Sequence, residues 1–276
     1  MNDPLELIDT WPVDIVAAGV VDVDGRVASR GPTDHMFRLA SISKVITGWA
    51  ALIAVEEGSI SLDDAVGQPG CTVRHLLSHA GGYAFTGPEP ISRPESRRIY
   101  SNTGIEMVAA HIERATGFGF SDYLTEAIFA PLGMASTSLR GSAAWAIHST
   151  IDDLVCFVRE LQSPRLLDAA TAADQRSVQF PDLAGLVPGV GTFRPCPWGL
   201  GCEIHGSKQP HWMSSTNSPE TYGHFGGSGT MLWVDPIAGT SLIALTNRDF
   251  DAWSTDAVRL WSELSDVVLS RRRSDR

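Results

Sequence analysis

The sequence predicts an α/β protein of the α+β type, with an antiparallel sheet built from both termini, flanking helices and an inserted all-helical lobe. The first observation is the stretch DIVAAGVVDVDGRVASRG, two β-rich runs joined at Asp24-Gly25, which is a hairpin signal. The second is GTMLWVDPIAGTSLIALTNR near the other end, where two apolar runs surround a Pro/Gly turn. Because the segments between them are mostly helical, we expect the strands of the two ends to share one sheet.

Helical periodicity fills the middle of the chain and returns near its end. The predicted helices are Ser41–Glu57 closed by Gly58, a stretch after Val73, Thr103–Thr116 closed by Gly117, FSDYLTEAIFAPLGM, TIDDLVCFVREL and Trp253–Leu269. Residues 170–220 are rich in Pro, Gly and Ser, so we expect a long irregular connection there. This order predicts a discontinuous α/β sheet domain of residues 1–35 and 195–276, and a helical domain of residues 36–194.

Composition indicates a folded globular protein and excludes several partners. The chain has 276 residues, of which 43% are hydrophobic and 19% charged. Its formal charge of -11 argues against nucleic acid or an anionic membrane, since both need a cationic face. The acidic N-terminal stretch does not resemble an export signal, so we expect a cytoplasmic protein. The four cysteines form no CxxC pair or zinc pattern, so we expect free thiols, no metal and no cofactor.

Ser41 and Lys44 are the first candidates for chemistry. Of the 21 basic residues, only Lys44 and Lys208 are lysines. A desolvated lysine can lose its proton and act as a base, which an arginine cannot do. Three positions apart at the start of an apolar helix, Ser41 and Lys44 share a face and can hydrogen-bond. Alone, S-x-x-K is a weak motif, because a serine that caps a helix with a lysine on the next turn also occurs by chance.

The stretch IYSNTG places Tyr100 and Asn102 one residue apart before a helix, where both can face one cavity. The phenol can relay a proton if a nearby cation, such as Lys44, lowers its pKa. The alternative is structural: Asn102 or Ser101 only caps the helix, and the tyrosine only packs.

The stretch YGHFGGSGTMLWVD places His224 at the head of a glycine-rich strand. Gly226, Gly227 and Gly229 let a substrate approach the main chain and leave N–H groups to bind an oxyanion. A simple bulge and a core histidine are the alternatives. Aromatic side chains can form an apolar acyl pocket or belong to the core; the candidates are Tyr83, Phe85, Trp198, Trp212 and Phe225.

Together these motifs resemble the serine β-lactamase and penicillin-binding-protein superfamily, in the branch of class C β-lactamases, D-alanyl-D-alanine carboxypeptidases and related esterases. The branch's three elements occur in order, as S-x-x-K, Y-x-N and a His-x-Gly strand motif. Flanking phrases such as VRHLLSHAGG, YSNTGIEMVAAHIERATG and GHFGGSGTMLWVDP extend the likeness over most of residues 13–250.

The resemblance implies that Ser41 is the acylated nucleophile, with Lys44 and Tyr100 as the proton-transfer pair. It implies that Asn102 orients Lys44 and the substrate. It also implies that His224 touches the leaving side of the substrate or holds the Tyr100 region.

The resemblance further implies an oxyanion hole made by the backbone N–H groups of Ser41 and Gly227, next to Gly226 of the strand motif. His79 in LLSHAGG matches a recurrent family position, where we expect it to hold a loop.

The expected function is cleavage of carboxylic esters through an acyl-enzyme. His224 stands where β-lactamases usually carry a lysine, which removes a permanent cation from the place of a β-lactam carboxylate. β-Lactamase, D-amino-acid peptidase and acyltransferase activities of the same fold stay open, as does a catalytically idle binding module. We expect a small-molecule ester or amide as partner; the sequence leaves the oligomeric state open.

Overall fold

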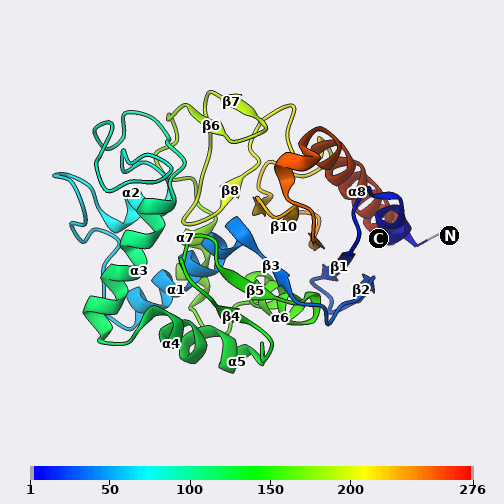
Figure 1. The fold of residues 1–276 in the computed structure, drawn as a ribbon, viewed down its shortest axis with the longest axis horizontal. Helices are drawn as coiled ribbons and strands as arrows, with labels where there is room; N and C mark the ends of the chain where they lie inside the picture. Colours follow the sequence, from blue (N-terminus) through cyan, green and yellow to red (C-terminus); the bar gives the residue numbers. More distant parts are fainter. Residues whose placement is uncertain (1–2, 275–276) are drawn as a thin grey trace.

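The computed structural model describes residues 3–274 and contains a six-stranded antiparallel sheet in the order β2-β1-β11-β10-β9-β8 (Figure 1). The strands are β1 (Val16–Asp22), β2 (Val27–Arg30), β8 (Glu203–Ile204), β9 (Tyr222–Gly226), β10 (Thr230–Asp235) and β11 (Thr240–Thr246). The two ends of the chain meet where β1 pairs with β11, from Val16 opposite Thr246 to Asp22 opposite Thr240. The predicted sheet of both termini is therefore confirmed.

Both predicted hairpins are present. Gly25, between β1 and β2, has a φ of 87°, which a residue with a side chain rarely adopts. The strands β10 and β11 pair across the turn that begins at Pro236.

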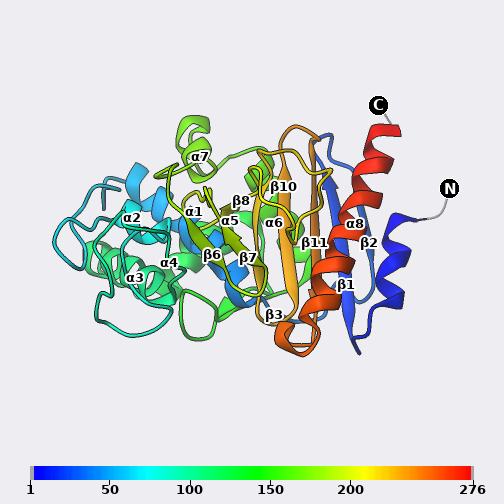
Figure 2. The same cartoon turned by 90° about the horizontal axis from the view of Figure 1, so that it is seen from above.

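The sheet separates two hydrophobic cores. Along β10, Leu232 and Val234 join one core, whereas Met231 and Trp233 join the other, as the two-residue period of a strand requires. The helices α1 (Ser43–Glu56) and α6 (Ile151–Gln162) cover the first face. The helix α8 (Ser254–Ser274) and the 3-10 helix η1 (Pro4–Thr10) lie side by side over the second face (Figure 2).

The short 3-10 helix η4 (Phe250–Ala252) contacts α8, whereas most of the other helices lie in the half of the molecule away from α8 (Figure 2). They are α2 (Val73–Leu77), α3 (Asn102–Thr116), α4 (Phe120–Leu124), η3 (Thr125–Phe129), α5 (Ala130–Leu132) and α7 (Ala169–Gln175). Gly117 ends α3 with a φ of 78°, so the predicted glycine stop is correct. The helices α1, α3, α6 and α8 begin and end within a few residues of their predicted bounds, apart from the longer C-terminal end of α8.

The predicted irregular connection at residues 170–220 is wrong in part. It contains most of α7, the hairpin of β6 (Gly185–Val187) and β7 (Gly191–Phe193), and the edge strand β8. These strands have two or three residues each, too short for a period-2 pattern to reveal them.

The division into two domains stays a prediction. The helix α6 does not fit neatly into either predicted domain. This helix lies in the range that we assigned to the helical domain but packs on the sheet, where a Cβ on Gly19 of β1 would lie 3.1 Å from Ile151. The small strands β3 (Phe37–Arg38), β4 (Ser138–Leu139) and β5 (Ile147–Ser149) form a separate sheet in the order β3-β5-β4. Over residues 3–274, no helix has the length and apolar character needed to cross a membrane.

Candidate active site

Ser41 lies in a one-turn 3-10 helix, η2 (Ala40–Ile42), directly before α1. Ala40, just before it, has a φ of 47°, a conformation that costs a residue with a side chain of order 1 kcal/mol or more. The strand β9 lies against this turn: a Cβ on Gly226 would be 2.3 Å from the Leu39 carbonyl oxygen. Only a glycine lets the strand approach so closely, so the glycine-rich motif fixes the position of Ser41.

Lys44 is fully buried in the first turn of α1, and its amine reaches the serine. Its Nζ lies 3.0 Å from Ser41 Oγ and donates to the Ala144 carbonyl at 2.8 Å. Burial lowers the pKa of Lys44 to about 7, although the Glu106 carboxylate opposes this change. A large fraction of the amine is therefore neutral near pH 7, with a lone pair available to a serine hydroxyl.

Tyr100 contacts the same serine through its hydroxyl. Its hydroxyl donates to Ser41 Oγ at 2.7 Å, and Lys44 Nζ lies 4.9 Å from the centre of its ring. Although the residue is only half-buried, desolvation around the hydroxyl raises the pKa of Tyr100 far above 10. The pKa of Tyr100 is therefore raised and not lowered beside Lys44, because desolvation outweighs the opposing hydrogen bond with Ser41. Tyr100 is a protonated phenol.

His224, on β9, lies beside Tyr100, and its imidazole ring is neutral. Its Nδ1 lies 2.6 Å from the Phe225 carbonyl, which can only accept, so Nδ1 holds the proton. Its Nε2 lies 3.3 Å from the Tyr100 hydroxyl. Burial, followed by the charge of Lys44, lowers the pKa of His224 to about 3. The histidine therefore offers its hydroxyl neighbour an acceptor, and it is uncharged at neutral pH.

The neighbours of Tyr100 divide into capping and packing roles. Ser101 caps α3 by accepting from the Gly104 N–H at 3.1 Å, whereas Asn102 occupies the first helical position. The Asn102 Oδ1 is buried without a hydrogen-bond partner among residues 3–274, and no bond joins it to Lys44 there. His79 accepts from the Ser101 N–H at 3.2 Å and packs 4.7 Å from the Tyr100 ring, the loop-holding contacts that we expected.

Gly227 follows β9 and differs from its neighbour Gly226. A Cβ on Gly227 would meet nothing within 4 Å, so its main chain borders open space. The role of the Ser41 and Gly227 N–H groups as an oxyanion hole stays a prediction.

Of the five aromatic residues that we considered for an acyl pocket, only Phe85 is exposed, at 54%. Its ring stacks 5.9 Å from that of Tyr100. The other four belong to the core or to the wall behind the site. Trp198 packs against three side chains of the site. The centre of its ring lies 5.0, 6.0 and 5.7 Å from the ring centres of His79, Tyr100 and His224.

Sequence reasoning missed the Ala144 carbonyl, the second partner of Lys44. It belongs to the segment between β4 and β5, residues 140–146, about a hundred positions away, and no motif marks a backbone oxygen.

Comparisons with known proteins show the family and the fold of the chain. Residues 13–263 match the Beta-lactamase family. A crystal structure of a beta-lactamase from Mycobacterium bovis is 45% identical, with a TM-score of 0.95 over 98% of this chain and 99% of that one. Simvastatin synthase from Aspergillus terreus shares the fold, with a TM-score of 0.80 at 18% identity over 99% of this chain and 100% of that one.

Curated relatives match over shorter stretches. Penicillin-binding protein 4* of Bacillus subtilis is 30% identical over 38% of this chain and 31% of its own length, so the chain spans about a third of that relative. Penicillin-binding protein 4 of Amycolatopsis lactamdurans is 28% identical over 85% of this chain and 78% of its own length. With its sheet and helices arranged as in the beta-lactamase fold and the family match over most of its length, the chain belongs to the Beta-lactamase family of serine hydrolases.

Proposed function

We propose that the chain hydrolyses carboxylic esters through an acyl-enzyme on Ser41. The neutral amine of Lys44, 3.0 Å away, takes the hydroxyl proton as Oγ attacks the ester carbonyl carbon. The N–H groups of Ser41 and Gly227 stabilise the negative oxygen of the tetrahedral intermediate. As the ester C–O bond breaks, Tyr100 gives its phenolic proton to the departing alkoxide, and the Lys44 ammonium restores the phenol. Water then attacks the acyl carbonyl carbon with Lys44 again as base. The bond between that carbon and Oγ breaks, the acid leaves, and the Lys44 ammonium returns its proton to Ser41 Oγ.

The observation behind the ester preference is the hydrogen bonding of His224. Its single N–H is used by the Phe225 carbonyl, and its free nitrogen faces the Tyr100 hydroxyl. A β-lactam carries a carboxylate beside its reactive amide, which needs a cation or several donors. Neither comes from this ring at neutral pH. An uncharged ester needs no such partner, and exposed Phe85 offers an apolar surface beside Tyr100 for its acyl chain or alcohol.

The second candidate is β-lactam or D-amino-acid amide cleavage. The relative from Mycobacterium bovis is called a beta-lactamase, and D-amino acid amidase from Ochrobactrum anthropi shares the fold. Side-by-side measurement of kcat/KM for p-nitrophenyl butyrate, nitrocefin and a D-amino-acid p-nitroanilide separates these substrates. We expect the ester value to be the largest; a nitrocefin value equal to it or above it favours the second candidate.

The alternative that the chain is a catalytically idle binding module can be tested without a substrate. A fluorophosphonate probe should form a stoichiometric adduct with the wild-type chain and none with Ser41→Ala, because it requires an activated serine. A folded wild-type chain that forms no adduct is a binding module instead.

A further inference from the structure

Two hydrogen bonds attach the segment between β4 and β5 to the first two turns of α1, and a third joins the first residue of β5 to the same helix. Lys44 donates to the Ala144 carbonyl at 2.8 Å, and Thr47 donates to the Ala143 carbonyl at 2.9 Å. Ser43 accepts from the Ile147 N–H at 3.1 Å. The position of this segment therefore decides where the amine of Lys44 is held.

Ser142 and Glu106 fix the outer side of the same segment. The Ser142 hydroxyl donates to a Glu106 carboxylate oxygen at 2.5 Å and accepts from the Ala144 N–H at 3.1 Å. One residue, Ala144, thus bonds to Ser142 through its N–H and to Lys44 through its carbonyl. A continuous hydrogen-bonded chain runs from the Glu106 carboxylate to the Lys44 amine.

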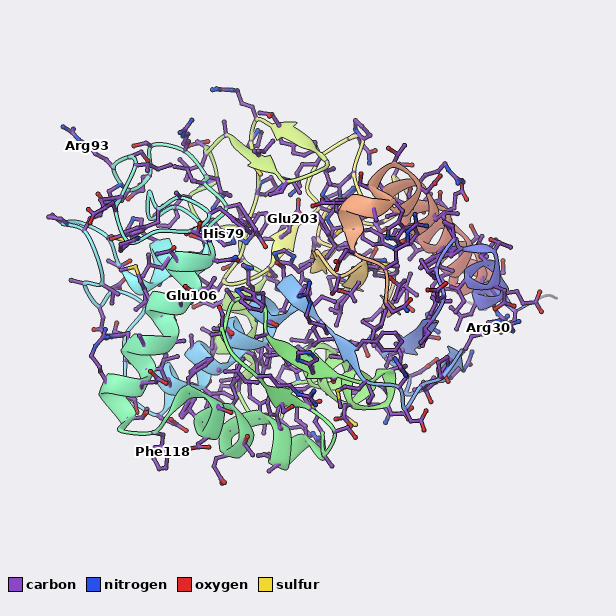
Figure 3. All side chains as sticks on the ribbon, in the orientation of Figure 1. Arg30, His79, Arg93, Glu106, Phe118 and Glu203 are labelled. Carbon is purple, nitrogen blue, oxygen red and sulfur yellow. The ribbon has the colours of Figure 1, made fainter. Side chains whose placement is uncertain are left out.

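Glu106 stands on α3, one helical turn after Asn102 and on the same face. Figure 3 labels it between α3 and the middle of the molecule, near the segment that leads from β4 to β5. It is exposed, so it has no packing role of its own. Nothing in the three family motifs identifies it, because the motif around Tyr100 ends at Asn102.

The other titratable groups around Lys44 are uncharged near neutral pH. Tyr100 is protonated, and burial keeps the pKa values of His79 and His224 below their ordinary value. Glu106 is the carboxylate whose charge acts on Lys44, and it favours the protonated amine.

We propose that Glu106 is a positioning residue for Lys44: it holds, through Ser142, the segment that binds the amine, and it places a negative charge behind that segment. Its charge retains the proton that Lys44 has taken from Ser41 long enough to be passed to the leaving group. The inference rests on the proposed role of Lys44 as base in ester cleavage.

The test follows the titration of Lys44 directly. Lysine labelled with ¹³C at Cε gives only two side-chain signals in this chain, since Lys44 and Lys208 are its only lysines. Glu106→Gln keeps an oxygen acceptor for Ser142 but removes the charge. We expect it to lower the titration midpoint of Lys44 by about 0.5 pH unit or more, the size of a screened charge interaction at the protein surface. The acidic limb of kcat/KM for p-nitrophenyl butyrate should move by the same amount.

Glu126→Gln is the matched control, because Glu126 is also an exposed helical carboxylate, and no hydrogen bond or ion pair within residues 3–274 joins it to the segment. It should leave the Lys44 midpoint within about 0.1 pH unit, as a remote exposed charge is screened. Equal midpoints in Glu106→Gln and Glu126→Gln overturn the inference, whether or not the chain cleaves esters. A midpoint that moves only in Glu106→Gln supports it even if the chain prefers another acyl substrate, so the two proposals fail separately.

Ser142→Ala examines the hydrogen-bonded chain itself. It preserves both charges but removes the link to Ala144, so we expect kcat above pH 8 to fall at least about threefold while the Lys44 midpoint changes less than in Glu106→Gln. A Ser142→Ala variant with the wild-type kcat shows that the segment is held without Glu106 and overturns the positioning role.

Discussion

At the scale of single residues, the state of one proton on Lys44 decides what the site can do. A neutral amine can donate to the Ala144 carbonyl and still accept from Ser41, whereas an ammonium can only donate. Lys44→Arg keeps a positive charge that cannot be given up, so we expect kcat for p-nitrophenyl butyrate to fall by about 10²–10⁴. Steady-state kinetics with a parallel unfolding curve measure the effect. A nearly active arginine variant means that Lys44 acts only as a fixed cation.

The protonation state of Lys44 also predicts how the activity of the wild-type enzyme depends on pH. Because Lys44 has a pKa of about 7 and must be neutral to act, kcat/KM for an uncharged ester should rise tenfold per pH unit below 7 and level off above it. His224 has a pKa of about 3, so it adds no second step between pH 5 and 8. A profile that declines from pH 5 to pH 8 contradicts the role of Lys44.

Tyr100 should matter to rate more than to binding. Tyr100→Phe keeps the ring that packs against His79 and Phe85 but removes the hydroxyl that bonds to Ser41. We expect kcat to fall at least about 10²-fold with little change in KM, as for loss of a general acid. A change confined to KM assigns Tyr100 to substrate binding instead.

At the scale of elements, β9 and the η2 turn position the serine, and two adjacent glycines test this. Gly226→Ala puts a Cβ 2.3 Å from the Leu39 oxygen, so β9 must move away from the turn. We expect it to lower the free energy of unfolding by about 1–3 kcal/mol and to reduce kcat. Gly227→Ala is the matched control for stability, because its Cβ enters open space. Urea unfolding measures the free energy of unfolding of both variants. Equal values for Gly226→Ala and Gly227→Ala contradict the close packing of β9 on the turn.

Much of this arrangement was predictable because it is local in sequence. Lys44 was chosen for its rarity among arginines, and the start of α1 placed it beside Ser41. The partners of Lys44 and Tyr100 were not predictable, because they come from distant segments: Ala144 and Ser142 from between β4 and β5, and Trp198 from the chain before β8. The raised pKa of Tyr100 also depends on burial, which spacing does not report.

At the scale of the whole molecule, the second lysine, Lys208, is the buried partner of a buried carboxylate. Lys208 lies 2.6 Å from Glu203 Oε1, and both side chains are inaccessible to solvent. His211 and Trp212 also bond to this carboxylate, at 2.8 Å each. Burial opposes ionisation of Glu203, but Lys208 and His211 outweigh it and hold the pKa of that carboxyl well below its usual range. Lys208 Nζ lies 5.8 Å from the centre of the Trp198 ring, which packs against His79, so this charged group lies behind the wall of the active site.

Lys208→Met should therefore destabilise the whole fold rather than only the site. It leaves Glu203 buried without its cation, which costs about 3–5 kcal/mol of unfolding free energy at pH 8. Arg259→Met, which breaks an exposed pair with Glu263 of 2.8 Å, is the control and should cost no more than about 0.5 kcal/mol.

The loss of unfolding free energy in Lys208→Met should become smaller as the pH falls. Without Lys208 the folded-state pKa of Glu203 rises, so the carboxyl takes up a proton in the native state as pH falls, and the unpaired charge disappears. The difference from wild type should therefore be smaller at pH 5 than at pH 8, while the Arg259→Met difference stays small at both. Urea unfolding at the two pH values measures it. A loss that is equal at both pH values, or that grows toward pH 5, means that Lys208 stabilises the fold by packing on Trp198 and Phe193 and not by pairing with Glu203.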